Sequence, residues 1–230
     1  MYREGRREGH DSIGTALVGK DCYLAEVTTA WGFTTYVLIQ NPSDFQNEVT
    51  ITYMTTDGPV THAEDPIRMA PNSRKTIRVN DVLAGKDFST RVRGTYGVIA
   101  ERAMYWGGGS ALGEACHDSV GMTSPHTTFY LPDGQASSGR ETWTLVQNPN
   151  PVAVSVEVSY LTAGGKGDVK WSESIPANSR KTFGMADNGI AGRASIMVRC
   201  KTSGKKIMCE RAMYWNNRGA GTDTIGGFSD

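Results

Sequence analysis

The chain has 230 residues, 38% of them apolar, which is enough to bury two cores of ordinary size. Its 24 basic and 24 acidic side chains cancel, and no predicted face gathers Lys or Arg, so the charge argues against nucleic-acid binding. No apolar run approaches the roughly 18 residues of a membrane span, and the charged start does not match a secretory signal. We therefore expect a soluble chain that does not insert into a membrane.

The chain opens with a charged segment, residues 1–20, which contains the motif "HDSIG" at His10–Gly14. The motif returns as "HDSVG" at His117–Gly121 and as "TDTIG" at Thr222–Gly226. In both later positions it follows a predicted last strand. We therefore interpret residues 1–20 as an N-terminal arm that is equivalent to the tail of a repeat.

Short runs separated by Gly, Pro and Asn follow the arm and predict β-strands. "TYVLIQNP" is an apolar run that an Asn-Pro turn ends. "NEVTITYM" alternates and places Val49, Ile51 and Tyr53 on one face, and "VSVEVSYL" repeats the pattern further on. "VNDVLAGKD" predicts at most one helical turn. Close spacing of short strands predicts an all-β fold built as an antiparallel sandwich.

Several strings occur twice in the same order. They are "QNP", "NSRKT" at Asn72–Thr76 and Asn178–Thr182, and "ERAMYW" at Glu101–Trp106 and Glu210–Trp215. Their spacing of about 107 residues is a whole-domain period. The sequence therefore predicts two tandem immunoglobulin-like sandwich domains, residues 21–125 and 126–230.

The repeated "ERAMYW" is predicted to be the last strand of each sandwich. Neither of its faces is purely apolar, which is typical of a strand that is covered on both sides. We interpret Trp106 and Trp215 as structural, with Glu101 and Arg102 paired to polar groups at the rim. The alternative interpretation is an aromatic platform that binds a ligand.

The four cysteines suggest two disulfides. Cys200 and Cys209 flank a Thr-Ser-Gly-Lys turn, and opposed residues of a hairpin have Cα atoms about 4.5–5.5 Å apart, within disulfide range. Cys22 and Cys116 form a second candidate pair, because the other copy lacks both. Disulfides would place the protein outside the cytoplasm. The alternative is four buried, reduced thiols.

Catalytic and metal-binding patterns are weak. "HDS" contains the residue types of an acyl-transfer triad, but consecutive residues of an extended segment point to opposite sides. The motif fits turn chemistry better, because its short polar side chains bond nearby backbone groups. The four histidines lack paired spacing and no C-x-x-C occurs. We expect no catalytic residues, no metal and no cofactor.

The strings "CYLAEVTTAWGFTTYVLIQNP", "PNSRKTIRVND", "AERAMYW" and "GHDSIGT" carry a family resemblance. The chain resembles the tandem β-sandwich repeats found in large secreted and cell-surface bacterial proteins. The resemblance covers nearly all of the first copy and the second copy more loosely. It implies an extracellular, non-catalytic module in an array, and it supplies no binding residues to transfer.

Two hypotheses for the function follow. The first is a structural or adhesive module that assembles head to tail, with the arm of one copy against the second domain of another. The residues expected at that contact are Met1, Tyr2, His10, Asp11, Ser12, Trp215 and Asn216. The second is a carbohydrate-binding module whose partner is a surface glycan, with Trp31, Trp143 and Trp171 as candidate sugar platforms.

Overall fold

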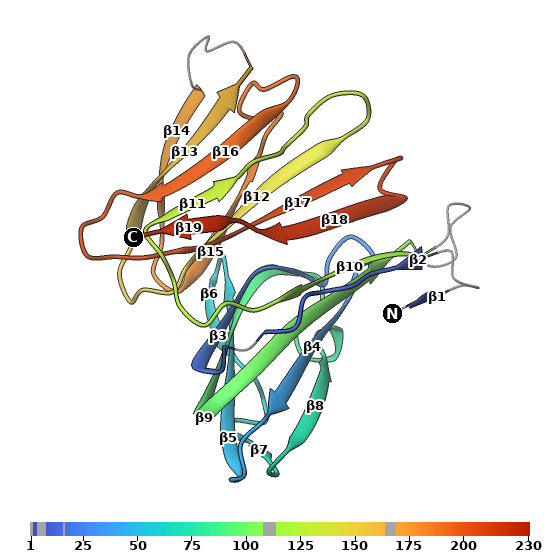
Figure 1. Ribbon diagram of the computed structural model, residues 1–230, viewed down its shortest axis with the longest axis vertical. Helices are drawn as coiled ribbons and strands as arrows, with labels where there is room; N and C mark the ends of the chain where they lie inside the picture. Colours follow the sequence, from blue (N-terminus) through green and yellow to red (C-terminus); the bar gives the residue numbers. More distant parts are fainter. Residues whose placement is uncertain (1, 4–7, 16, 108–113, 164–168) are drawn as a thin grey trace. The chain divides into compact units, whose positions relative to one another are not determined.

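The computed structural model describes residues 2–3, 8–15, 17–107, 114–163 and 169–230 (Figure 1). The chain divides into two compact units, Met1–Ser124 and Pro125–Asp230. Every strand pairing within them is antiparallel, so the predicted all-β antiparallel fold is confirmed. Among the described residues, no helix has the length and apolar character needed to cross a bilayer.

The first unit is a sandwich of two layers that share the long strand β9 (Asp87–Trp106). One layer pairs the first half of β9 with β3 (Gly19–Thr28) and β5 (Asn47–Thr55), and β5 also pairs with β6 (Gly58–Thr61) and β7 (Ile67–Met69). The other layer pairs its second half with β4 (Thr34–Asn41) and β10 (Ala115–Val120), and β4 pairs with β8 (Ser73–Arg78). A 3₁₀ turn, η2, spans Val79–Asp81, as the sequence predicts. In the arm, β1 (Tyr2–Arg3) pairs with β2 (Glu8–Gly9).

β9 passes from one layer to the other between Gly94 and Ile99. A Cβ at Gly94 would lie 2.6 Å from the carbonyl oxygen of Tyr96 and 2.9 Å from Oδ1 of Asn47, so this bend requires glycine. The amide of Asn47 fixes the bend, because it accepts from the backbone N–H of Tyr96 at 3.1 Å and donates to the carbonyl of Gly97 at 3.3 Å.

The second unit repeats this topology with β9 replaced by two strands, β16 and β17. One layer is β14 (Val169–Ile175), β13 (Val154–Thr162), β16 (Ala194–Cys200), β11 (Thr128–Leu131) and β19 (Gly227–Ser229). The other is β15 (Ser179–Gly184), β12 (Glu141–Asn148), β17 (Met208–Trp215) and β18 (Ala220–Ile225). An immunoglobulin constant domain places its sixth strand between the third and the seventh. Here β16 lies between β13 and β11, so the layers are as predicted but the strand order is different.

The core lies between the layers and follows the alternation of the sequence. Val49, Ile51 and Tyr53 of β5 are all fully buried, as are Val156 and Val158 of β13. Burial of each such side chain contributes roughly 1.5–3 kcal/mol, so these alternating strands supply much of the stabilisation.

Candidate functional site

The interior of the first unit contains a buried charged cluster of Glu26, Arg102 and His117. Arg102, in the second half of β9, is 0% exposed, and its Nη2 lies 3.4 Å from Oε2 of Glu26 on β3. Its Nη1 lies 2.9 Å from Nδ1 of His117 on β10. The prediction that Arg102 pairs at the rim is therefore wrong. Period two points it inward together with Ala100 and Met104, which are also buried.

The contact with Arg102 fixes the protonation of His117. A guanidinium can only donate, so Nδ1 of His117 accepts and the ring proton is on Nε2, which lies 3.8 Å from Oε2 of Glu26. Burial, followed by the charge of Arg102, holds the pKa of His117 well below its usual value. The imidazole is therefore neutral, and its ring packs at a tilt against Trp106 with centroids 5.1 Å apart.

The opposite face of the same sheet forms an arm-docking site, defined by Glu101, Tyr105 and Asp118. β2 of the arm contacts β10 (Figure 1), and the ring of His10, directly after β2, reaches side chains of this site. Nδ1 of His10 lies 3.0 Å from Oδ2 of Asp118, and its Nε2 lies 3.0 Å from the hydroxyl of Tyr105. The His10 and Asp118 side chains are only 7% and 5% exposed. The arm therefore has a binding site on its own chain.

The two carboxyl groups of the arm-docking site have opposite pKa shifts. Burial, together with the charge and the hydrogen bond of Asp118, raises the pKa of Glu101. Burial opposes ionisation of Asp118 as well, but the hydrogen bond and charge of His10 outweigh it and lower its pKa. Of the two carboxyl groups, Asp118 is therefore the one that ionises more readily, and it faces His10. This arrangement holds His10 on the sheet.

The second unit carries only part of this arrangement. Arg211, which corresponds to Arg102, is buried, and its Nη1 donates to the backbone carbonyl of Asp133 at 2.6 Å. Burial lowers the pKa of Arg211, although the charges of Asp133 and Asp223 oppose the shift. Thr222 occupies the position of His117 in the motif. The histidine cluster is therefore specific to the first unit.

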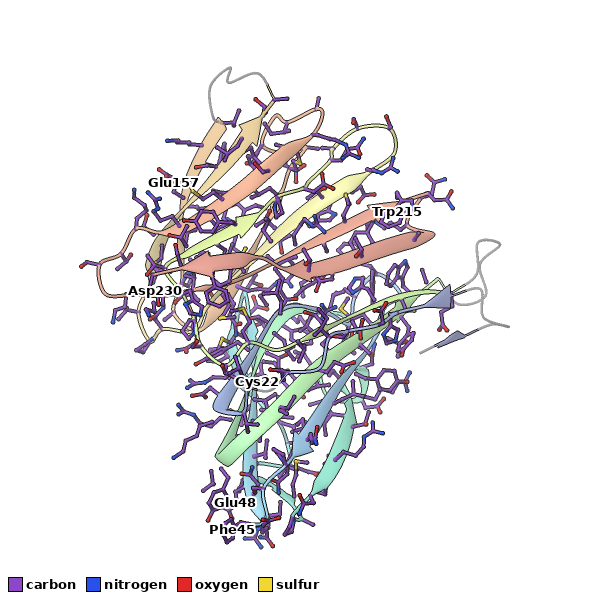
Figure 2. All side chains as sticks on the ribbon, in the orientation of Figure 1. Cys22, Phe45, Glu48, Glu157, Trp215 and Asp230 are labelled. Carbon is purple, nitrogen blue, oxygen red and sulfur yellow. The ribbon has the colours of Figure 1, made fainter. Side chains whose placement is uncertain are left out.

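Both predicted disulfides are wrong, because all four cysteines are buried thiols. Cys200 ends β16 and stands opposite Val156, whereas Cys209 is on β17, opposite Val146, in the other layer. The turn between them crosses from one layer to the other and is not a hairpin. Cys22 lies inside the first unit (Figure 2), where its thiol contacts the carbonyl of Ala100 at 3.6 Å. Cys116 stands opposite Tyr105 on the face that carries the arm-docking site.

Of the remaining residues expected at a subunit contact, Asp11, Ser12 and Asn216 are exposed. Tyr2 lies on β1, and Met1 lies outside the described residues. Trp215 is half-buried at the end of β17 (Figure 2), and Asn216 begins an exposed turn with a left-handed φ of 55°. Among the described residues of this set, His10 is the one held in the arm-docking site.

The three candidate sugar platforms lie in different settings. Trp31 is 74% exposed at a loop tip, with its indole N–H 3.4 Å from Oδ2 of Asp87. Trp171 is 47% exposed on β14, near Glu173. Trp143 is half-buried on β12 and borders a cavity of about 220 Å³ in the second unit. Trp31 belongs to the first unit, and within the second unit Trp143 and Trp171 lie in different layers.

The cavity beside Trp143, which we call the Trp143 pocket, is lined by residues of β12, of the turn before it and of the segment after β15. Its polar lining includes Ser137, Arg140, Glu141 and Asp187. Nη2 of Arg218 donates to Oε2 of Glu141 at 2.6 Å, and this hydrogen bond lowers the pKa of Glu141. The pocket thus has one carboxylate, Glu141, that is paired with a guanidinium, and it also has an acidic side chain, Asp187, and a basic side chain, Arg140, in its lining.

Glu26 was not among the residues predicted from the sequence, and His10 was predicted to contact another copy, with no partner for the arm in its own chain, whereas it contacts Asp118 and Tyr105 of the same unit. Glu26 stands in "CYLAEVTT", an otherwise apolar and β-branched strand, and a charge inside such a run signals a buried partner. Arg102 gives the same signal inside "IAERAMYW". Neither string identifies the partner, because β3, β9 and β10 meet only in the folded unit.

No family model and no curated protein sequence matches the chain. Among solved structures, the chain is similar to the protein titled Thermotoga maritima 1070, with 15% identity and a TM-score of 0.41 over 46% of this chain and 95% of that one. It is also similar to the Anabaena sensory rhodopsin transducer, with 18% identity and a TM-score of 0.33 over 39% of this chain and 86% of that one. An α-L-rhamnosidase of Streptomyces avermitilis matches 92% of this chain with 28% of its own length, at 8% identity and a TM-score of 0.23. These TM-scores carry no argument about function.

Proposed function

We propose that the chain is a non-catalytic structural or adhesive module of the bacterial cell surface that associates head to tail with copies of itself through the N-terminal arm. The observation that carries this proposal is the binding of His10 to Asp118 and Tyr105. The extracellular location rests on the resemblance of the sequence, because the four thiols remove the argument from disulfides.

The arm-docking site suits exchange between copies. It is built from β9 and β10 of the folded sandwich, whereas the arm belongs to a separate two-stranded element. The arm of a neighbouring copy presents the same histidine and therefore fits the same site. When each arm passes to the next copy, an open chain forms, and two copies that exchange arms form a closed dimer.

The docking contact also joins two copies of one motif. His10 belongs to "HDSIG" in the arm, and Asp118 belongs to "HDSVG" in β10. Because the motif carries both a histidine and an acceptor aspartate, the histidine of one copy of the motif can bind the aspartate of another copy. Asp11, which corresponds to Asp118, is exposed in the arm.

The test is the mass of the full chain by light scattering over a wide concentration range. Full-length protein is expected to assemble as concentration rises, whereas deletion of residues 1–14 or the His10→Ala substitution is expected to give monomers. Leu17→Ala, which changes an exposed arm residue outside the expected contact set, is the matched control and should assemble like the original chain. Oligomers that persist without the arm, or a full-length chain that stays monomeric throughout, contradict the proposal.

A further inference from the structure

The Trp143 pocket lies at a place where the two units differ in one cross-strand pair of residues. In the first unit, Tyr36 on β4 stands opposite Arg78 on β8, and Nη1 of Arg78 lies 3.2 Å from Oδ1 of Asp81. In the second unit, Trp143 stands opposite Gly184. The two units therefore share this strand pairing, but the second has glycine where the first has the long side chain of Arg78 opposite the aromatic residue.

Gly184 allows the carboxylate of Asp187 and the ring of Trp143 to approach the backbone between them. A Cβ at this position would overlap the carboxylate of Asp187 and lie 2.9 Å from Cζ3 of the Trp143 ring. Asp187 corresponds to Asp81 of the first unit, where the same carboxylate binds a guanidinium. The acid is thus retained, while the group that binds it in the first unit is absent.

Arg140, which precedes β12, and Asp187, which follows β15, both line the pocket. Within the described part of the chain, neither makes a side-chain hydrogen bond or an ion pair. The carboxylate of Glu141, in contrast, is held by Arg218 and by the indole N–H of Trp143 at 3.3 Å. The pocket therefore offers one acceptor, one donor and an indole ring for a ligand.

We propose that the Trp143 pocket binds a single pyranose ring at the end of a neutral glycan, an activity beyond the self-association proposed above. Its volume of about 220 Å³ is smaller than the roughly 300–1,000 Å³ of sites for drug-sized ligands, which suits one ring. The apolar C–H face of a sugar packs on an indole, as an amphipathic ring favours.

The polar groups specify the same ligand. A sugar hydroxyl both donates and accepts, so neighbouring hydroxyls satisfy the Asp187 carboxylate and the Arg140 guanidinium together. The opposite charges of these two side chains cancel, which favours a neutral ligand over an anion or a cation. The first unit, in which Arg78 takes this place, is expected to bind no sugar here.

The experiment is a titration of the full chain with neutral methyl glycosides, monitored by amide and indole N–H shifts in NMR spectra. We expect a saturable shift at the Trp143 indole and the Gly184 amide for at least one glycoside, with a Kd on the order of 1 mM. Asp187→Asn, at an exposed position that leaves the core intact, should weaken binding about tenfold or more. Gly184→Arg should abolish it, because it restores the side chain of the first unit.

Tyr130→Ala is the matched control, since it removes an exposed aromatic side chain of the same unit outside the pocket and should leave the affinity unchanged. Three results overturn the proposal: no saturable shift with any neutral glycoside up to about 50 mM, which is well above the expected Kd; equal binding by the Gly184→Arg variant; or tighter binding of a charged amino acid than of every sugar. None of these depends on whether the arm mediates assembly.

Discussion

Replacement of Arg102 by methionine is expected to destabilise the first unit by about 3–5 kcal/mol. The guanidinium is 0% exposed and lies 3.4 Å from the carboxylate of Glu26, which is 4% exposed. At this separation and an effective dielectric constant of about 20, the Coulomb attraction is about 5 kcal/mol. Methionine has a similar length but no charge, so the carboxylate of Glu26 stays buried without its guanidinium.

A double variant separates the charge from the packing. Glu26→Gln combined with Arg102→Met removes both charges, and it should recover most of the stability that Arg102→Met alone loses. The free energy of unfolding is best measured by hydrogen exchange of amides in β4 and β9, because this readout reports on the first unit alone. A loss below about 1 kcal/mol for Arg102→Met, or a double variant no more stable than the single one, would contradict a stabilising ion pair between Arg102 and Glu26.

Three further results are expected. The pKa of His117 is lower in the folded than in the unfolded chain, so unfolding takes up a proton below about pH 6.5. The free energy of unfolding of the first unit should therefore fall by about 1.4 kcal/mol per pH unit below that value. This pH dependence is measured as the difference between the original chain and a His117→Asn variant across a pH series. Burial, followed by the charges of Glu210 and Asp223, raises the pKa of Cys209, so this thiol should resist a thiol reagent in the native chain and react in denaturant, whereas reaction at the native rate of a surface thiol contradicts the structure. Trp106→Ala should cost about 3–5 kcal/mol in thermal or chemical unfolding, since the ring is 5% exposed and stacks on Phe33, while the half-buried Trp215 should cost less on truncation; equal losses count against this difference.

The strands were predictable because their signal is local. Alternation in "NEVTITYM" reflects which side of a strand faces the core, and this requires no knowledge of the partner strand. The duplication was equally visible, since identical strings at one spacing imply one framework. The helical turn at Val79–Asp81 was also predicted from its local sequence.

The cysteine pairing could not be predicted from the same signals. Cys200 and Cys209 flank a short turn in both a hairpin and a crossover, and local sequence does not separate these two geometries. In the first unit the equivalent segment is an unbroken strand that bends at Gly94. Which layer receives the second half is decided by the packing of the whole sandwich.

The sequence by itself therefore determined the strand content, the alternation of the cores and the two-copy organisation. The contacts of Arg102 with Glu26 and His117, the docking of His10 on Asp118, and the close approach of Asp187 and Trp143 at Gly184 depend on the tertiary structure. The difference lies in the sequence separation of the residues that interact. Alternation and turn chemistry act over a few neighbouring residues, whereas these contacts join strands that are far apart in the chain and meet only when the layers close on their core.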